Sequence, residues 1–251
     1  MRLAILADIH GNLLALEAVL DDLRLRGTID LAVNLGDCVS GPLWPAETCR
    51  LLMDRKWPTV RGNHDRAVAF DVPASMWSSD AFAHAALSVD QRAWLGALPC
   101  LSEFAPGVIA FHGRPDNDNR YTLDDIEGGR LVASNVAKVA MRLGQRARGA
   151  RLALCGHSHQ PRLLQTDGGP FVVNPGSVGC PAYDDPAGTP HVSEAGSPHA
   201  RYAIATLRDD GSIAVDFLAV TYDHLAAAKQ ARTNGRPEWA HALETGFQKQ
   251  V

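Results

Sequence analysis

The sequence predicts an α/β protein, and three features of the 251-residue chain lead to this fold class. Short apolar runs alternate with helical patterns near the N-terminus, which is typical of a parallel sheet with covering helices. Strand-like runs without helices between them occupy much of the second half. Hydrophobic residues make up 46% of the composition, which is enough for a full core. We therefore expect a largely parallel sheet followed by antiparallel strand pairs.

The N-terminal segment predicts three strands separated by two helices. The strands are expected at 2–6, 31–35 and 58–60, and the helices at 12–27 and 46–55. In the first helix Asn12 is a suitable N-cap, Gly27 is a stop signal, and one face is apolar. That face consists of Leu13, Leu16, Val19, Leu20 and Leu23.

The middle of the chain predicts a helical insertion followed by one more strand and helix. Residues 66–104 carry helical patterns, with Ser88 as a good N-cap. Residues 107–113 are expected to form a strand, and residues 134–148 a helix capped by Ser134.

Beyond residue 150 the pattern changes to strands joined by turns. The DGG and DDG sequences predict antiparallel hairpins. Residues 179–200 are rich in Pro, Gly and Ser and predict a long surface loop, either mobile or a lid. Residues 222–246 predict two helices broken at Asn234–Gly235. The expected strands are 151–155, 161–166, 170–174, 201–207 and 212–220.

We expect one domain over residues 1–251, with an insertion at about 66–104 and C-terminal helices at about 221–248. The formal net charge is −4 and the basic residues are scattered, which argues against a nucleic-acid or membrane-surface partner. No apolar run reaches the roughly 20 residues of a membrane span, and the N-terminal run is too short for a signal sequence. Five cysteines without a CxxC pair indicate reduced thiols, so we expect a cytoplasmic protein. A homo-oligomer contact through the aromatic insertion is a further expectation.

Polar side chains follow the apolar runs at the points where strands should end. Such loops meet at the carboxyl edge of an open α/β sheet, where ligand sites form. Within CGHSH, two histidines lie two residues apart and would share one target if the chain stays extended. The positions at this edge are Asp8, His10, Asp37, Asn63, His64, His112, His157 and His159.

Seven of these residues have the donor chemistry of a dinuclear metal site. Oxygen and nitrogen donors without thiolate suit Mn²⁺, Fe or Zn²⁺. Seven donors are too many for one tetrahedral ion but suit two ions roughly 3.5 to 4 Å apart with a bridging carboxylate. The seven are Asp8, His10, Asp37, Asn63, His112, His157 and His159.

The charge of such a site indicates its substrate. Only Asp8 and Asp37 are anionic, so two divalent ions would leave about two excess positive charges. This excess favours a phosphoester anion and lowers the pKa of a bridging water, which makes hydroxide available near neutral pH. No Ser or Cys lies in a nucleophile motif, so we expect direct in-line attack without a covalent phosphoenzyme.

The motifs DIH, GD, GNHD, HG and GHSH occur in this order, and the set resembles the calcineurin-like metallophosphoesterase superfamily. NPGSVG and the YD…PEW helices resemble its compact bacterial and archaeal phosphodiesterase branch, and the resemblance covers essentially the full chain. It implies an αββα sandwich of two mixed β-sheets flanked by helices. It also implies two divalent transition-metal ions, with Mn²⁺ favoured and Fe, Zn²⁺ or Ni²⁺ as alternatives.

The resemblance implies a role for each site residue. His64 would stand beside the leaving-group oxygen as general acid or oxyanion stabiliser, held by Asp65. The implied ligand sets are Asp8, His10 and His159 for one ion and Asn63, His112 and His157 for the other, with Asp37 bridging both.

Simpler interpretations stay open for several residues. Asp8 could only cap a helix, Asn63 could only form a turn, and His64 could be a solvated loop histidine. Arg114 could clamp a phosphate with its bidentate fork or be an ordinary surface arginine. Residues 174–177 (NPGS) are expected as a turn in the pocket wall.

The expected activity is hydrolysis of a phosphodiester or nucleotide, including a dinucleoside polyphosphate. Trp77, Trp94 and Tyr183 could stack a base, although Trp residues more often lie in the core. A phosphomonoesterase or phosphoprotein phosphatase is the alternative, and a non-catalytic scaffold of the same fold is a third possibility. The segment GCPAYDDPAG departs from the usual polar run of the branch, so the resemblance carries over no substrate contact there.

Overall fold

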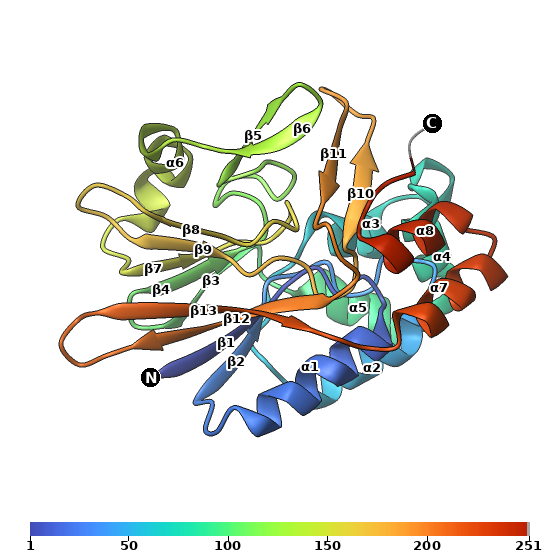
Figure 1. Cartoon of the computed structure of the whole chain (residues 1–251), viewed down its shortest axis with the longest axis horizontal. Coiled ribbons are helices and arrows are strands. Elements are labelled where there is room, and N and C mark those ends of the chain that lie inside the picture. Colours follow the sequence, from blue (N-terminus) through green and yellow to red (C-terminus); the bar gives the residue numbers. More distant parts are fainter. Residues whose placement is uncertain (250–251) are drawn as a thin grey trace.

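The computed structural model describes residues 1–249 and contains two β-sheets packed face to face (Figure 1). One sheet has the strand order β13-β12-β1-β2 and the other β3-β4-β7-β9-β8. Their strands are β1 (Arg2–Leu6), β2 (Leu31–Asn34), β12 (Ala200–Leu207), β13 (Ile213–Val220), β3 (Leu101–Ala105), β4 (Val108–Phe111), β7 (Leu152–Leu154), β8 (Arg162–Gln165) and β9 (Phe171–Asn174).

Both sheets are mixed. In the first, β1 pairs in parallel with β2 and antiparallel with β12. In the second, β7 lies parallel to both β4 and β9. The two hairpins predicted from the Gly-rich turns, β8–β9 and β12–β13, are antiparallel as expected. The strand expected at 58–60 is reduced to a single parallel bridge between Thr59 and Asn34.

The side-chain alternation of β1 explains the layering. Leu3 and Ile5 lie in an apolar cluster with Val108 and Leu152 of the other sheet. Because successive strand residues point to opposite faces, Ala4 and Leu6 face away from that cluster and pack with the helices instead. Each of these side chains is fully buried.

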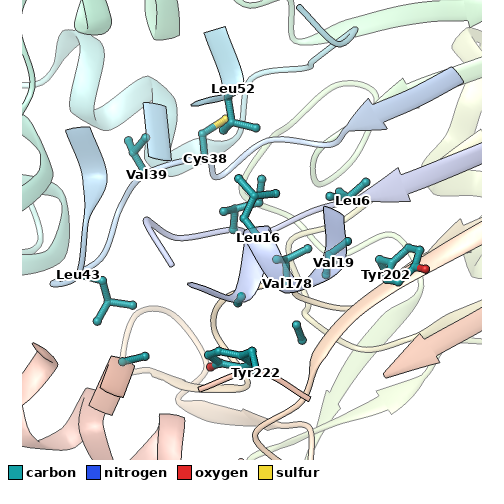
Figure 2. Packing of buried hydrophobic residues seen from close by; sticks show 14 of the residues in the cluster. Leu6, Leu16, Val19, Cys38, Val39, Leu43, Leu52, Val178, Tyr202 and Tyr222 are labelled. Carbon is teal, nitrogen blue, oxygen red and sulfur yellow. The ribbon is translucent and has the colours of Figure 1, made fainter. Parts of the chain in front are cut away.

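Helices cover the outer faces of both sheets. Leu16 and Val19 of α1 pack in one cluster with Leu6 and Tyr202 of the first sheet (Figure 2). Val139 and Leu143 of α6 pack against the outer face of the second sheet. The αββα arrangement is therefore confirmed. The helices are α1 (Leu13–Leu25), α2 (Pro45–Arg55), α3 (Asn63–Phe70), α4 (Ser78–Ala86), α5 (Val89–Ala97), α6 (Val136–Leu143), α7 (His224–Thr233) and α8 (Pro237–Thr245).

The helix caps follow from short polar side chains. Asn12 accepts a hydrogen bond from the amide of Ala15, and Ser88 accepts one from the amide of Gln91, as predicted. The cap predicted at Ser134 is wrong, because the Oδ1 of Asn135 accepts from the amide of Lys138 and α6 begins one residue later. Either residue type can cap, so the sequence alone did not distinguish the neighbours.

A third sheet corrects two expectations, the count of two sheets and the long loop at 179–200. Its order is β10-β11-β6-β5, and the presumed loop forms the hairpin β10–β11. In β11 the buried residues are His191 and Ser193. Every second residue is therefore buried, as in an ordinary strand, but these residues are polar, so the sequence shows no alternation of hydrophobic side chains that would predict the strand. The strands are β5 (Asp124–Glu127), β6 (Arg130–Ala133), β10 (Ala182–Asp185) and β11 (His191–Glu194).

The helices expected in the insertion at about 66–104 and near the C-terminus are present. Between residues 63 and 97 lie α3, a short 3₁₀ helix at Pro73–Ser75, α4 and α5, whereas residues 101–105 form strand β3. The C-terminal helices α7 and α8 are separated at Asn234–Arg236. No helix in the described part of the chain combines the length and apolarity needed to cross a bilayer.

Candidate metal centre

The predicted ligand residues come from loops at one edge of the two sheets. Asp8 and His10 follow β1, Asp37 follows β2, and His112 follows β4. The parallel pairing of β1 with β2, and of β4 with β7 and β9, brings these strand ends to the same edge.

The side chains form two groups, each with its ligand atoms within 4.8 Å of one another. The two groups are adjacent, because the Nε2 of His10 is 3.9 Å from Asp37 and the Nε2 of His112 is 3.8 Å from Asp8. Asn63 lies beside them at the start of α3. The groups are Asp8, His10 and His159, and Asp37, His112 and His157.

His157 and His159 do not share a target. They belong to different groups because the chain is not extended there: both residues have positive φ angles, 69° and 58°. The expectation from strand alternation was therefore wrong at this point. Of the six non-glycine residues with positive φ among the described residues, five are predicted ligands. Those five are Asp8, His10, Asp37, His157 and His159.

Backbone carbonyls orient three of the histidines. The Nδ1 atoms of His10, His112 and His159 lie 2.6, 2.8 and 2.8 Å from the carbonyl oxygens of Ser40, Leu35 and Cys180, respectively. A carbonyl only accepts, so each Nδ1 carries a proton, which leaves Nε2 as the nitrogen that would face a metal ion. This second contact is typical of metal-ligating histidine.

Unsatisfied buried atoms support the fit of these residues to metal ions. The Oδ1 of Asn63 and the Nε2 of His112 are buried without a hydrogen-bond partner among the described residues. His112 Nε2 does lie 3.0 Å from an Asp37 oxygen, but it makes no hydrogen bond of acceptable geometry. Such atoms are costly to leave unpaired, and a bound cation would satisfy both.

Burial sets the protonation of the histidines. Burial, with repulsion from His159, lowers the pKa of His10 to about 4. Burial, with repulsion from His112, lowers the pKa of His157 to about 3. Burial also opposes the charged form of His112, but the carboxylate of Asp37 outweighs it and raises the pKa of His112 to about 9. Metal ligation requires the neutral imidazole, which two of the three already hold at neutral pH.

Asp80, and not Asp65, holds His64. The Nδ1 of His64 lies 2.8 Å from the Oδ1 of Asp80, which also accepts from the hydroxyl of Ser40 at 2.6 Å. Burial opposes the charged form of His64, but Asp37 and Asp80 outweigh it and raise its pKa to about 9. Asp80 was not predicted, because an acidic residue in the first turn of a helix is an ordinary helix-start signal.

Asp65 instead shapes the backbone of the Asp37 loop. Its carboxylate accepts from the amides of Asp37, Cys38 and Gly62 at 2.8 to 3.0 Å. Burial and the nearby Asp37 raise its pKa to about 6. The predicted role of Asp65 as the partner of His64 is thus corrected to the support of the metal-ligand loop.

A cavity of about 390 Å³ opens beside the two groups. Residues of both groups and His64 line it, together with residues of α4, β10, α8 and several loops. Trp77 and Tyr183 line this cavity, whereas Trp94 packs against the apolar core. Further lining residues, which the sequence motifs did not predict, are Ser79, Asn119, Tyr121, Arg236, Glu238 and Trp239.

Arg114 is not among the residues that line the cavity. Its Nε donates to the carbonyl oxygen of Tyr121 at 2.9 Å, which indicates a structural role in the following loop. In the NPGS turn, Asn174 donates to the carbonyl oxygen of Gly156, and Ser177 donates to that of Asp8. The turn therefore supports the ligand loops.

Comparisons with known proteins agree with this geometry. Over 264 aligned residues, the chain is 26% identical to the uncharacterized protein MJ0912 of Methanocaldococcus jannaschii, covering 94% of each chain. It is 26% identical to a metallophosphoesterase of known structure from Sphaerobacter thermophilus, with a TM-score of 0.73 over 98% of this chain and 100% of the other. The hypothetical protein PH1004 from Pyrococcus horikoshii shares the fold at 21% identity, with a TM-score of 0.74 over 99% of both chains.

The family model described as the calcineurin-like phosphoesterase superfamily domain matches residues 1–195. This match includes both ligand groups and His64. The chain therefore belongs to the calcineurin-like phosphoesterase superfamily and is a metal-dependent phosphoesterase.

Proposed function

We propose that the chain hydrolyses small phosphodiesters, with nucleotides and dinucleoside polyphosphates as the expected substrate class. The observation that carries this proposal is the pair of adjacent ligand groups, which reach one cavity together with His64. When bound there, two divalent ions would supply Lewis acidity, activated water and a positive field for the phosphoester anion.

The proposed ligand sets keep the two groups separate. Asp37 would be shared by the two ions. Its position supports this role, because one carboxylate oxygen lies 3.0 Å from His112 Nε2 and 3.9 Å from His10 Nε2. The sets are Asp8, His10 and His159 for one ion, and Asn63, His112 and His157 for the other.

His64 would donate a proton to the leaving-group oxygen. Asp80 occupies its Nδ1, so Nε2 is the nitrogen that remains for a substrate. The Asp80 carboxylate favours the protonated imidazole, the form that a general acid requires.

The walls of the cavity favour a small substrate over a folded phosphoprotein. The hairpin strand β10 and the N-terminal ends of α4 and α8 line it, and its volume suits a ligand of modest size. The aromatic rings of Trp77 and Tyr183 offer stacking surfaces for a base. A phosphomonoester remains the alternative substrate.

We propose Mn²⁺ as the bound metal, because the donors are oxygen and nitrogen with no thiolate. We also propose a cytoplasmic location. The supporting observation is that all five cysteines are free, which suits a reducing compartment.

The test compares turnover of bis(p-nitrophenyl) phosphate and p-nitrophenyl phosphate by the Mn²⁺-loaded protein. Preference for the diester supports the proposal, and preference for the monoester would replace it with a phosphomonoesterase. His64→Ala should abolish turnover and leave the metal content unchanged. His224→Ala, on α7 outside the cavity lining, is the control and should retain both.

A further inference from the structure

The cavity beside the metal centre contains a single Lys or Arg side chain among its lining residues, Arg236. Arg236 directly precedes α8 and lies beyond the part of the chain that the family model matches. Its Nε donates to Glu238, and its second guanidinium nitrogen, Nη1, donates to the hydroxyl of Ser79 at 3.3 Å. These contacts hold the guanidinium between α8 and α4.

The attachment to Ser79 places Arg236 near the leaving-group side of the proposed site. Ser79 is the neighbour of Asp80 in α4, and Asp80 holds the Nδ1 of His64. If His64 protonates the leaving group, a group attached to that leaving group would extend toward α4 and α8. Arg236 is the cation that it would meet there.

The remaining lining gives this cavity an uneven charge. Strand β10 contributes two carboxylates, Asp184 and Asp185, which would repel an anion. The α4 and α8 side contains Arg236, and both helices present their N-terminal ends there, which favours negative charge. Arg236 is partly neutralised by Glu238, but within the described residues its Nη2 donates no hydrogen bond. That nitrogen is available to an added acceptor.

We propose that Arg236 binds a second anionic group carried by the leaving group, so that the preferred substrates are phosphoesters with an anionic leaving group. A phosphate and a carboxylate share this chemistry, and both can accept from a guanidinium. The proposal rests on the proposed phosphodiesterase function and specifies which diesters the site selects.

The test uses three derivatives of thymidine 5′-monophosphate that differ only in the leaving group: the p-nitrophenyl ester, the 3-carboxyphenyl ester, and the phosphoanhydride with a second thymidine 5′-monophosphate. Variant-to-wild-type ratios of kcat/KM cancel the intrinsic reactivity of each substrate. Arg236→Gln should lower kcat/KM by about tenfold or more for one or both anionic leaving groups, the usual effect of losing a charge-assisted hydrogen bond. Turnover of the p-nitrophenyl ester should change less than about twofold.

Two further variants control for charge and folding. Arg232→Gln removes an equal charge from α7, where Arg232 pairs with Glu244 outside the cavity lining, and should leave all three ratios unchanged. Arg236→Lys should restore part of the lost selectivity, because it keeps the charge without the planar fork. Thermal melting of each variant checks that the fold is intact.

Each outcome has a defined meaning. Equal losses for all three substrates would overturn the proposal in favour of a structural role for Arg236, and so would unchanged ratios throughout. A loss for only one of the two substrates with an anionic leaving group supports it and identifies phosphate or carboxylate as the group bound. Absence of turnover of the p-nitrophenyl ester by metal-loaded wild type would instead refute the proposed function, independently of Arg236.

Discussion

Substitution of Gly62 by Ala should disable the metal centre without imposing backbone strain. Gly62 has φ −82° and ψ 171°, an extended conformation that alanine adopts freely. A Cβ there would lie 2.0 Å from the Oδ1 of Asp37 and 2.5 Å from its backbone nitrogen. The effect of the substitution therefore comes from contact with Asp37, with both its proposed bridging carboxylate and its backbone nitrogen.

The displacement follows from these distances. Ordinary van der Waals contact begins near 3.4 Å, so the Asp37 carboxylate or the Gly62 backbone must move by about 1.4 Å. Overpacking of this kind costs about 1–3 kcal/mol of stability. A displacement of about 1 Å at a catalytic group lowers turnover on the order of 10²-fold. We expect Gly62→Ala to show both effects and to bind fewer ions.

The assay combines metal analysis after dialysis, thermal melting and turnover of bis(p-nitrophenyl) phosphate. Gly96→Ala is the matched control, because its Cβ would come close only to the end of the Phe70 ring, which is 62% exposed and can move, and would make an ordinary contact of 3.5 Å with the Cβ of Ala69. Gly96 lies within helix α5, so alanine there should be neutral or stabilising by up to about 1 kcal/mol. Full metal content and full turnover in Gly62→Ala would refute the reasoning.

Four further perturbations have definite expected outcomes. Leu16→Ala should cost about 2–5 kcal/mol in urea unfolding, because Leu16 is fully buried, whereas Leu25→Ala, at an 85% exposed position, should stay within about 0.5 kcal/mol. Asp80→Asn should lower turnover by about ten- to a hundredfold with unchanged metal content, because Asp80 holds His64. Asp90→Asn, on the exposed side of α5, should change neither quantity. A loss of metal in Asp80→Asn would contradict the assignment of Asp80 as the partner of His64. Removal of bound metal by a chelator should lower the melting temperature and added Mn²⁺ should restore it, since ions bind the ligand groups of the folded state. An unaffected melting curve would count against a metal site. Burial opposes the charged form of Asp22, but hydrogen bonds from Arg26 and Tyr202 outweigh it and leave the pKa of Asp22 below its usual value. The stability that wild type gains over Asp22→Asn should therefore be constant above about pH 5 and vanish on further acidification. A difference in unfolding free energy that does not depend on pH would exclude this linkage.

Local sequence signals predicted the elements whose stabilising groups are neighbours in the chain. The apolar face of α1, its Asn12 cap and the Ser88 cap are examples, since each depends on side chains within one or two turns. The hairpin β10–β11 was missed because its buried positions, such as His191 and Ser193, are polar. Its partner β6 is also distant in sequence, and the pairing of β11 with β6 has no local signature.

The residues of the candidate site also fall into those that local sequence patterns predicted and those that they did not. The motifs at the strand ends identified the residues of both ligand groups, because parallel strands carry their following loops to one edge. Asp80 and Arg236 follow no strand. Asp80 reaches His64, and Arg236 reaches the cavity, only through the packing of α4 and α8. Arg114 illustrates the opposite error: it follows a motif directly, but its side chain turns to the carbonyl oxygen of Tyr121.

The conformation of the ligand loops makes the metal centre dependent on the packing of the protein core beneath it. Five predicted ligands adopt positive φ angles, and each such non-glycine conformation costs about 1–3 kcal/mol. Amide hydrogen bonds from Asp8, His10 and Gly11 to the carbonyls of Gly36, Asp37 and Cys38 hold two of these loops together. Since the buried residues beneath them also form the apolar core, damage to that core should release the ligand loops before global unfolding. Metal affinity should therefore fall in core variants such as Leu16→Ala even under conditions where the chain remains folded.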